Sequence, residues 1–168
     1  METEVKLQYN NKKAIIQLLK NNRFNIIKKI KIKDSYFGQG HSLMSDVNQL
    51  YRIRETNERL FEFTYKNKIS EKDKITKRQE INVSIDKPVA MHKILLSLGC
   101  RLIKENYSEK EIWEKDNIRL EFIKNKKPQK IKFIEIEGIS NKAISKLINL
   151  LGAYVKPVGE KIFSNKTN

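Results

Sequence analysis

The sequence contains very few of the residues that form disulfides or soft-metal sites. Its 168 residues include one cysteine, Cys100, and two histidines, His41 and His92, which lie far apart in the chain. A single cysteine excludes an internal disulfide framework, and these few thiol and imidazole groups provide no zinc ligand set with the usual spacing. Any metal bound by this chain would therefore have to be held by oxygen ligands, which suit magnesium, manganese or calcium.

Long hydrophobic runs are also missing. No segment approaches the ~20 apolar residues that a membrane-spanning helix needs, and the N-terminus does not have the pattern of a signal peptide. We therefore expect a cytoplasmic protein without a membrane partner. Internal repeats and low-complexity linkers are absent as well, and the length suits one domain. We expect a single domain over residues 1–168, with mobile residues at its very end.

Positive charge is abundant. Lys and Arg number 35 against 20 Asp and Glu, which gives a formal net charge of +15. Such an excess favours an anionic partner such as nucleic acid, a nucleotide, a polyphosphate or an acidic membrane surface. Many lysines fall in two runs, Lys28 to Lys33 and Lys124 to Lys130. Runs of this kind are more often solvated faces and turns than binding sites, so the charge predicts the sign of the partner and not its identity.

Helical periodicity occurs in three segments, and alternation with a period of two occurs in most of the remainder. The predicted helices are 11–22, 87–98 and 141–151, and the predicted strands are 2–9, 25–37, 48–55, 59–67, 76–85, 100–107, 110–115, 117–124 and 130–137. Short polar turns between neighbouring strands are typical of antiparallel meanders, and no βαβ rhythm is present. The predicted fold class is α+β.

The predicted strands share one unusual property, an apolar face backed by a face that is dense in charges of both signs. In segment 48–55, for example, Arg52 and Arg54 alternate with Tyr51 and Ile53. Three amphipathic helices can cover the apolar face. If they pack outside, closure of the sheet removes its unpaired edges and lines a lumen with charged groups. Because uncompensated burial of these charges would be prohibitive, the lumen must hold water, metal ions and an anion.

The charges are not distributed at random over these strands. Carboxylates are concentrated on the first and last strands with two between, namely Glu2, Glu4, Glu80, Glu121, Glu135 and Glu137. Cations are concentrated on the middle strands, namely Arg52, Arg54, Lys66 and Arg78, with Lys6 and Lys104 in addition. Carboxylate oxygens suit a hard divalent ion, and Arg and Lys suit phosphate oxygens. Together they indicate metal-assisted phosphoryl chemistry.

Simpler interpretations exist for each part of this set. A solvated strand face is the favoured account of Glu2, Glu4 and Lys6 taken alone. Cross-strand pairing with Glu62 or Glu80 is as good an account of the two arginines Arg52 and Arg54.

The motifs of this chain, taken in order, resemble those of the CYTH proteins, the triphosphate tunnel metalloenzymes. The opening Glu2-Thr3-Glu4-Val5-Lys6 resembles the ExExK motif of that family. The other matching elements are Tyr36-Phe37, Tyr51-Arg52-Ile53-Arg54, Phe63-Thr64-Tyr65-Lys66, Arg78-Gln79-Glu80, Leu98-Gly99-Cys100 and Ile134-Glu135-Ile136-Glu137. A lone ExExK is weak evidence, whereas an ordered series over residues 2 to 137 is specific.

The resemblance implies a closed eight-stranded antiparallel β-barrel, a triphosphate tunnel with helices outside, that binds Mg²⁺ or Mn²⁺ and a triphosphate-containing small molecule. It places Glu4 and Lys6 as catalytic residues. Phosphates would be held by Lys6, Arg52, Arg54, Lys66, Arg78 and Lys104. The metal would be served by Glu2, Glu4, Glu135 and Glu137, with Glu80 and Glu121 as supports. The general base would be a water on the metal, or Lys6 if neighbouring cations lowered its pKa.

The sequence departs from the family pattern at several positions. Asn82 replaces an expected Glu, Asn106 an expected Arg, and Glu121 a common Asp, while Val158-Gly159-Glu160 replaces a Ser-Tyr element. These changes leave the metal end nearly complete and reduce the phosphate end.

Three functions are therefore weighed. The first is a metal-dependent hydrolase of inorganic triphosphate, nucleoside triphosphates or thiamine triphosphate. The second is a class IV-type adenylate cyclase, and the third is a non-catalytic binder of polyphosphate, nucleotide or RNA 5′ ends. Nucleic acid is a secondary partner in this reading, and both a monomer and a homodimer remain open.

Overall fold

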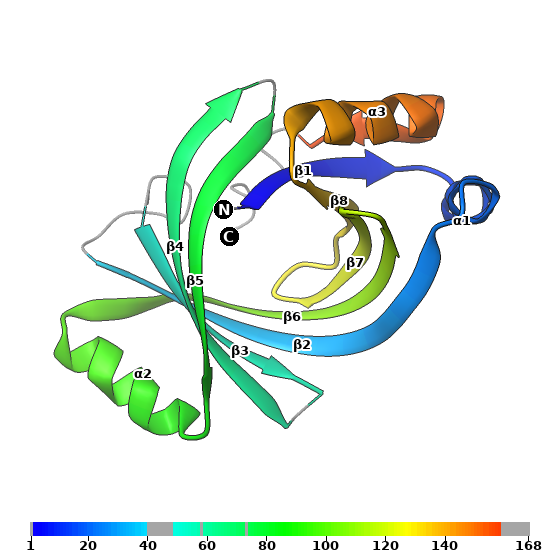
Figure 1. Ribbon diagram of the computed structural model, residues 1–168. Coiled ribbons are helices and arrows are strands. Elements are labelled where there is room, and N and C mark those ends of the chain that lie inside the picture. Colours follow the sequence, from blue (N-terminus) through cyan, green and yellow to red (C-terminus); the bar gives the residue numbers. More distant parts are fainter. Residues whose placement is uncertain (1, 40–48, 58, 73, 159–168) are drawn as a thin grey trace.

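The computed structural model describes residues 2–39, 49–57, 59–72 and 74–158, with only the backbone of Glu2 (Figure 1). His41 and the terminal residues 159–168 lie outside these ranges. The helices are α1 (Lys12–Asn21), α2 (Pro88–Ser97) and α3 (Asn141–Leu151), followed by the 3₁₀ turn η1 (Gly152–Tyr154). The strands are β1 (Glu2–Tyr9), β2 (Asn25–Gln39), β3 (Gln49–Thr56), β4 (Leu60–Lys72), β5 (Ile75–Ile85), β6 (Cys100–Lys115), β7 (Ile118–Lys127), β8 (Lys132–Gly138) and β9 (Val155–Pro157).

The strands form a closed antiparallel barrel. Their order is β5-β4-β3-β2-β6-β7-β8-β1, and a further pairing of β1 with β5 joins the two ends. In that closing pair Glu2 lies opposite Arg78 and Val5 opposite Ile75. The short strand β9 pairs with the other end of β1 at Leu7 to Tyr9. The predicted eight-stranded antiparallel barrel is therefore confirmed, and Figure 1 shows the three helices outside it.

Two apolar clusters hold the helices against the outer surface of the barrel. The larger cluster joins Ile15 and Leu19 of α1 and Ile144 and Leu147 of α3 to the apolar face of β1, β7 and β8. The smaller one joins Leu95 of α2 to the outer side of β2, β3 and β6. Each fully buried Leu or Ile side chain of this kind contributes about 1.5–3 kcal/mol. Since both clusters lie outside the barrel, the opposite side of each strand faces the lumen.

Local sequence explains where two of the helices begin. The side chain of Asn11 accepts the Ala14 N–H at 3.0 Å, and that of Ser140 accepts the Ala143 N–H at 3.2 Å. These bonds satisfy N–H groups that a helix start leaves unpaired. Asp86 is the residue that the sequence suggests as the cap of α2, but the cap position is Lys87 and no side-chain bond is made there. No helix among the described residues is long and apolar enough to cross a membrane.

Two features of the sheet differ from the prediction. The predicted strands 100–107 and 110–115 are one continuous strand, β6, which contains a register shift between Tyr107 and Ser108. A bulge inserts an extra residue and interrupts the alternation, so the sequence pattern resembles a break between two strands. The sequence also gives no sign of β9, because three residues are too few for a periodic pattern.

Candidate functional site

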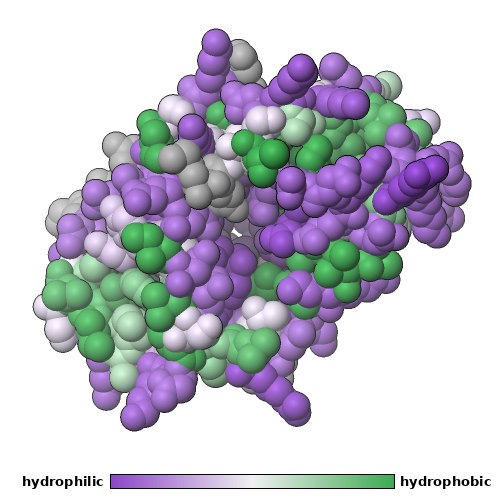
Figure 2. All heavy atoms as spheres, viewed as in Figure 1, coloured by the Kyte–Doolittle hydropathy of each residue, from purple (hydrophilic) through white to green (hydrophobic). Residues whose placement is uncertain are grey.

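The lumen of the barrel is lined by charged residues from all eight of its strands. Figure 2 shows an opening near the middle of the molecule, surrounded mainly by hydrophilic residues. Strand pairing and burial place the following charged side chains on the lumen face: Glu4, Lys6, Asp34, Arg52, Arg54, Glu62, Lys66, Arg78, Glu80, Lys104, Lys110, Arg119, Glu121, Glu135 and Glu137. The charged face that the sequence predicted is therefore turned inward.

A carboxylate cluster occupies the wall made by β1 and β8. Glu4 lies opposite Glu137 in that pairing, and Lys6 lies opposite Glu135. One carboxylate oxygen from each of Glu4, Glu135 and Glu137 lies within 4.8 Å of the other two. The side chains of Glu4 and Glu135 are only 6% and 10% exposed. Three acidic groups are thus held together in a region where water screens them poorly.

The surrounding charges divide these carboxylates into unlike states. Burial opposes ionisation of Glu4, but Lys6, a hydrogen bond with Glu135, Lys66 and Arg78 outweigh it and hold the pKa of Glu4 well below its usual range. Burial, reinforced by the negative charge of Glu4, raises the pKa of Glu135 to about 8. At neutral pH the two carboxylates therefore share one proton, because two like charges this close cannot both ionise.

Lys6 lies between the carboxylates as a cation. Its Nζ is 3.7 Å from Glu4 Oε1 and 3.7 Å from Glu135 Oε1. The negative charges of Glu135 and then Glu4 raise the pKa of Lys6. A role for Lys6 as a base would require the opposite shift. Its contacts in the structure therefore favour a permanent charge.

A basic row crosses the lumen wall beside this cluster. Tyr36 of β2 lies opposite Arg52 of β3 on one side and opposite Lys104 of β6 on the other, and Arg52 lies opposite Thr64 of β4. Arg52 is buried, and its Nη2 donates to Thr64 Oγ1 at 2.8 Å and to Glu62 Oε1 at 3.2 Å. Its Nε is buried and makes no hydrogen bond among the described residues.

Lys104 completes that row without an acidic partner. No carboxylate in the described part of the chain forms an ion pair with it, and burial together with repulsion from Lys6 lowers its pKa. This repulsion also shows that Lys104 and Lys6 lie close enough across the lumen to influence one another. The basic row and the carboxylate cluster therefore meet at Lys6.

Arg54 is held by a buried aspartate. Its Nε and Nη2 donate to Asp34 Oδ1 and Oδ2 at 2.7 and 2.9 Å, a bidentate arrangement. The Tyr36 hydroxyl donates to the same carboxylate at 3.2 Å. Burial opposes the charge on Asp34, yet Arg54 and Arg52 lower its pKa. Burial and the charge of Asp34 raise the pKa of Tyr36 to about 12, so the phenol stays protonated.

Three further acidic groups of the predicted site are paired with cations. Lys66 forms an ion pair with Glu80, and Lys110 forms one with Glu121. Arg119 lies 3.4 Å from Glu137. Glu80 and Glu121 are not in the carboxylate cluster, so any part they play in a metal site would be indirect. The side chain of Glu2 is not described.

Sequence reasoning missed two charged groups in the lumen. Asp34 shares the parity of Ile32 and Tyr36 in β2, so strict alternation would have revealed it. Lys110 lies just beyond the bulge in β6, and the interpretation of that segment as two strands removed the phase needed to orient it. Asn106, which stands where the resemblance expects Arg, donates through Nδ2 to Asn125 Oδ1 at 3.3 Å.

The donor chemistry of the cluster suits a hard divalent cation. Mg²⁺ and Mn²⁺ prefer carboxylate oxygens, and Glu4, Glu135 and Glu137 supply them within a small volume. A cation at this position would replace the proton that Glu4 and Glu135 share. The residues present therefore fit a divalent cation beside a surface that suits phosphate groups.

Comparisons with known proteins agree with this architecture. A protein of Methanocaldococcus jannaschii named "putative adenylate cyclase" is 32% identical over 120 residues, which are 70% of this chain and 66% of that relative. A solved protein from Pyrococcus horikoshii OT3 has a TM-score of 0.77 at 22% identity and covers 98% of this chain and 100% of its own.

A third similar protein is a structure from Hippeastrum. It is described as a putative adenylyl cyclase with a dominant triphosphatase activity, and it has a TM-score of 0.69 at 14% identity over 95% of this chain and 91% of its own. At these identities the solved structures support the fold alone. The family model of the CYTH domain matches residues 1–146, most of the chain. The chain therefore belongs to the CYTH domain family.

Proposed function

We propose that this protein is a metal-dependent phosphohydrolase that cleaves a triphosphate bound inside the barrel. The observation that carries the proposal is the meeting of two surfaces at Lys6: the carboxylate cluster of Glu4, Glu135 and Glu137, and the basic row that contains Arg52 and Lys104. One surface suits a divalent cation and the other suits a chain of phosphates.

The basic row supplies the phosphate contacts in this proposal. Lys104 forms no ion pair with the described carboxylates, and the Nε of Arg52 has a free N–H, so both can receive phosphate oxygens without first losing a partner. Arg54, Lys66 and Arg78 contact acidic residues, which hold their side chains in place beside the substrate. Positioned cations of this kind provide most of the protein's part in phosphoryl transfer.

The carboxylate cluster supplies the metal site. Glu4, Glu135 and Glu137 would hold Mg²⁺ or Mn²⁺, with Glu2 as a further candidate. The bound cation would bridge phosphate oxygens and neutralise charge as the bond breaks. Lys6 would contact the same phosphate as a permanent cation, and its ammonium would stabilise the negative charge that develops there.

The experiment uses two substrates and two metal conditions. The protein is incubated with ATP or inorganic triphosphate, first with Mn²⁺ and then with EDTA, and orthophosphate, pyrophosphate and cyclic AMP are quantified. We expect orthophosphate release that requires the metal. Glu4→Gln and Glu135→Gln should abolish it, whereas Glu109→Gln on the outer wall should not. Turnover that persists in EDTA, or in the first two variants, would contradict the site assignment.

A class IV-type adenylate cyclase is the second candidate. The Methanocaldococcus jannaschii relative carries that name, while the Hippeastrum structure is described with triphosphatase activity. The same site would then direct the ribose 3′-hydroxyl to the α-phosphorus of ATP, and the assay would yield cyclic AMP with pyrophosphate. Tight binding of ATP or triphosphate without products would instead support a non-catalytic binder, to which the Asn106 substitution in the basic wall would contribute.

A further inference from the structure

The two lysine runs of the sequence lie on neighbouring strands of the outer barrel wall. β6 pairs with β2 along one edge and with β7 along the other, and β7 pairs with β8. In this register Lys31, Glu109, Lys124 and Lys132 form one row across the four strands. We call the cations of this region the lysine wall; they are Lys31, Lys33, Lys124, Lys126, Lys127 and Lys132.

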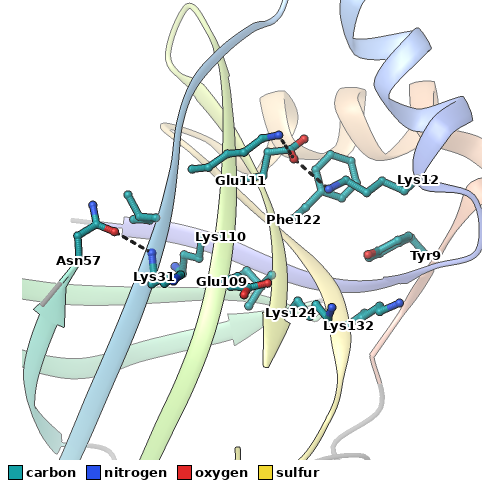
Figure 3. A pocket seen from close by; sticks show the side chains of 13 residues that line it. Tyr9, Lys12, Lys31, Asn57, Glu109, Lys110, Glu111, Phe122, Lys124 and Lys132 are labelled. Atoms are coloured by element: carbon teal, nitrogen blue, oxygen red, sulfur yellow. Dashed lines mark hydrogen bonds and ion pairs between the residues drawn. The ribbon is translucent and has the colours of Figure 1, made fainter. Parts of the chain in front are cut away.

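The lysine wall borders a continuous groove on the side of the sheet opposite the lumen. One cavity of about 700 Å³ extends from Tyr9 and Lys12 to Lys31 and Lys132, and a second of about 490 Å³ continues past Lys33. The two cavities share Lys31 and Glu109 in their walls. Figure 3 shows Lys124 and Lys132 beside Glu109, and Glu111 joined to Lys12. The groove is therefore long, open and predominantly basic.

The acidic residues of the groove neutralise only part of this charge. Glu111 is 3.1 Å from Lys12 Nζ and 3.5 Å from Lys29 Nζ. Glu109 is 3.0 Å from Lys126 Nζ. No described carboxylate forms an ion pair with the remaining cations of the wall at positions 31, 124, 127 and 132.

The remaining cations also repel one another. Lys124 lies directly opposite Lys132 in the β7–β8 pairing, and like charges in this position destabilise a sheet. The proximity of Lys126 lowers the pKa of Lys124, with a further contribution from Lys132. An anion bound along the row would remove this repulsion.

Aromatic rings lie among these lysines. Tyr107 is 37% exposed, and the ammonium groups of Lys33 and Lys127 lie 5.6 and 5.9 Å from its ring centroid. At the other end of the groove Lys12 lies 4.7 Å from the ring centroid of Phe122. Cations that alternate with a partly exposed ring are the combination that binds single-stranded nucleic acid, where bases stack on rings and phosphates contact lysines.

We propose that the lysine wall binds the phosphate backbone of single-stranded nucleic acid, independently of the tunnel. Successive lysines on β2 are two residues apart, about 6.8 Å, and neighbouring strands are about 4.8 Å apart. The cations thus form an extended array, which suits a chain of phosphates better than a single small anion. Because lysines contact phosphates as point charges and carry no code for bases, binding is tolerant of sequence.

The test measures binding of a labelled oligouridylate about 15 nucleotides long by fluorescence anisotropy. The strand has a 5′-hydroxyl, so it offers no triphosphate to the tunnel, and EDTA is present throughout. The groove variant carries Lys31→Gln, Lys124→Gln and Lys132→Gln. The control variant carries Lys72→Gln, Lys77→Gln and Lys93→Gln, which removes equal charge from exposed sites elsewhere. Circular dichroism and the tunnel activity serve to establish that both variants fold.

We expect the groove variant to bind more weakly, with a salt slope that is less steep by about 2, since each lysine lost from a single strand contributes about 0.7. Between 50 and 200 mM salt the wild type would then lose roughly 20-fold more affinity than the groove variant. The control variant should match the wild type. Equal weakening in both variants would reduce the effect to net charge and overturn the proposal.

Two further results would also overturn it. The first is displacement of the strand by inorganic triphosphate added with Mn²⁺ in place of EDTA, which would mean that the tunnel binds it. The second is tighter binding of a duplex of the same length. Neither result depends on whether the tunnel hydrolyses triphosphate, so the lysine wall and the proposed function can fail separately.

Discussion

Replacement of Asp34 by Ala is the perturbation that most directly measures the charge network of the lumen. The Asp34 side chain is 3% exposed and that of Arg54 is 19% exposed, and two hydrogen bonds of 2.7 and 2.9 Å join them. Removal of one partner from a buried pair leaves an uncompensated charge and costs about 3–5 kcal/mol. For a chain of this size the melting temperature should fall by roughly 6–20 °C.

The assay is urea unfolding followed by circular dichroism, with Glu109→Ala as the matched control. Glu109 also forms an ion pair, at 3.0 Å with Lys126, but the two side chains are 45% and 40% exposed. Surface pairs of this kind contribute about 0–1 kcal/mol. We therefore expect Asp34→Ala to lower the free energy of unfolding several times more than Glu109→Ala does.

A double variant separates charge from packing. Asp34→Ala combined with Arg54→Met removes both charges, and we expect it to recover a large part of the stability that Asp34→Ala loses. An Asp34→Ala cost below about 1 kcal/mol, or a double variant no more stable than the single one, would refute the reasoning.

Four other predictions follow from the described contacts. Glu135→Gln should weaken Mn²⁺ binding by tenfold or more in calorimetry, because one of three clustered carboxylates is lost; unchanged affinity would remove Glu135 from the metal site. Lys104→Ala should weaken inorganic triphosphate binding in the same calorimeter, whereas Lys93→Ala on the exposed face of α2 should not. Ile144→Ala, at a residue that is 0% exposed, should cost about 2–5 kcal/mol in urea unfolding, and Ile139→Ala, at one that is 76% exposed, should change stability by less than about 0.5 kcal/mol. The stability contributed by ionised Asp34 should be fully present above the ordinary Asp pKa of about 3.9 and be lost as the pH falls through its lowered folded pKa, so the difference between wild type and Asp34→Asn should shrink in acid; a difference independent of pH would contradict this.

The fold could be predicted from the sequence because period-two alternation survives wherever a strand pairs regularly. Residues 2–9 and 117–124 each carry apolar side chains on one parity and charged ones on the other, and both parities lie where alternation places them. The prediction failed where local geometry departs from that period. The bulge at Tyr107 divided β6 into two predicted strands, and β9 is too short to show any period.

The candidate site could be predicted in its membership but not in its contacts. Motif order identified Glu4, Glu135 and Glu137, and the structure brings these three together. No sequence pattern indicated that Asp34 would hold Arg54 by two hydrogen bonds, because β2 and β3 are separated by a long connection and the partner is set by strand register. The pKa of Glu135 likewise depends on burial and on Glu4.

The outer wall shows the same limit from another side. The lysine runs of residues 28–33 and 124–130 are separated by most of the chain, and each alone is an ordinary solvated segment. Only the strand order β2-β6-β7-β8 combines them into one surface. Charge composition therefore predicted an anionic partner, and topology was needed to suggest where a second one would bind.

A crystal structure with Mn²⁺ and a non-hydrolysable triphosphate analogue tests the central claim most directly. The account predicts anomalous density for Mn²⁺ at the oxygens of Glu4, Glu135 and Glu137, and a triphosphate chain that runs from there past Lys6 to Arg52 and Lys104. Mn²⁺ bound elsewhere, or a triphosphate found only on the outer wall with an empty lumen, would contradict it.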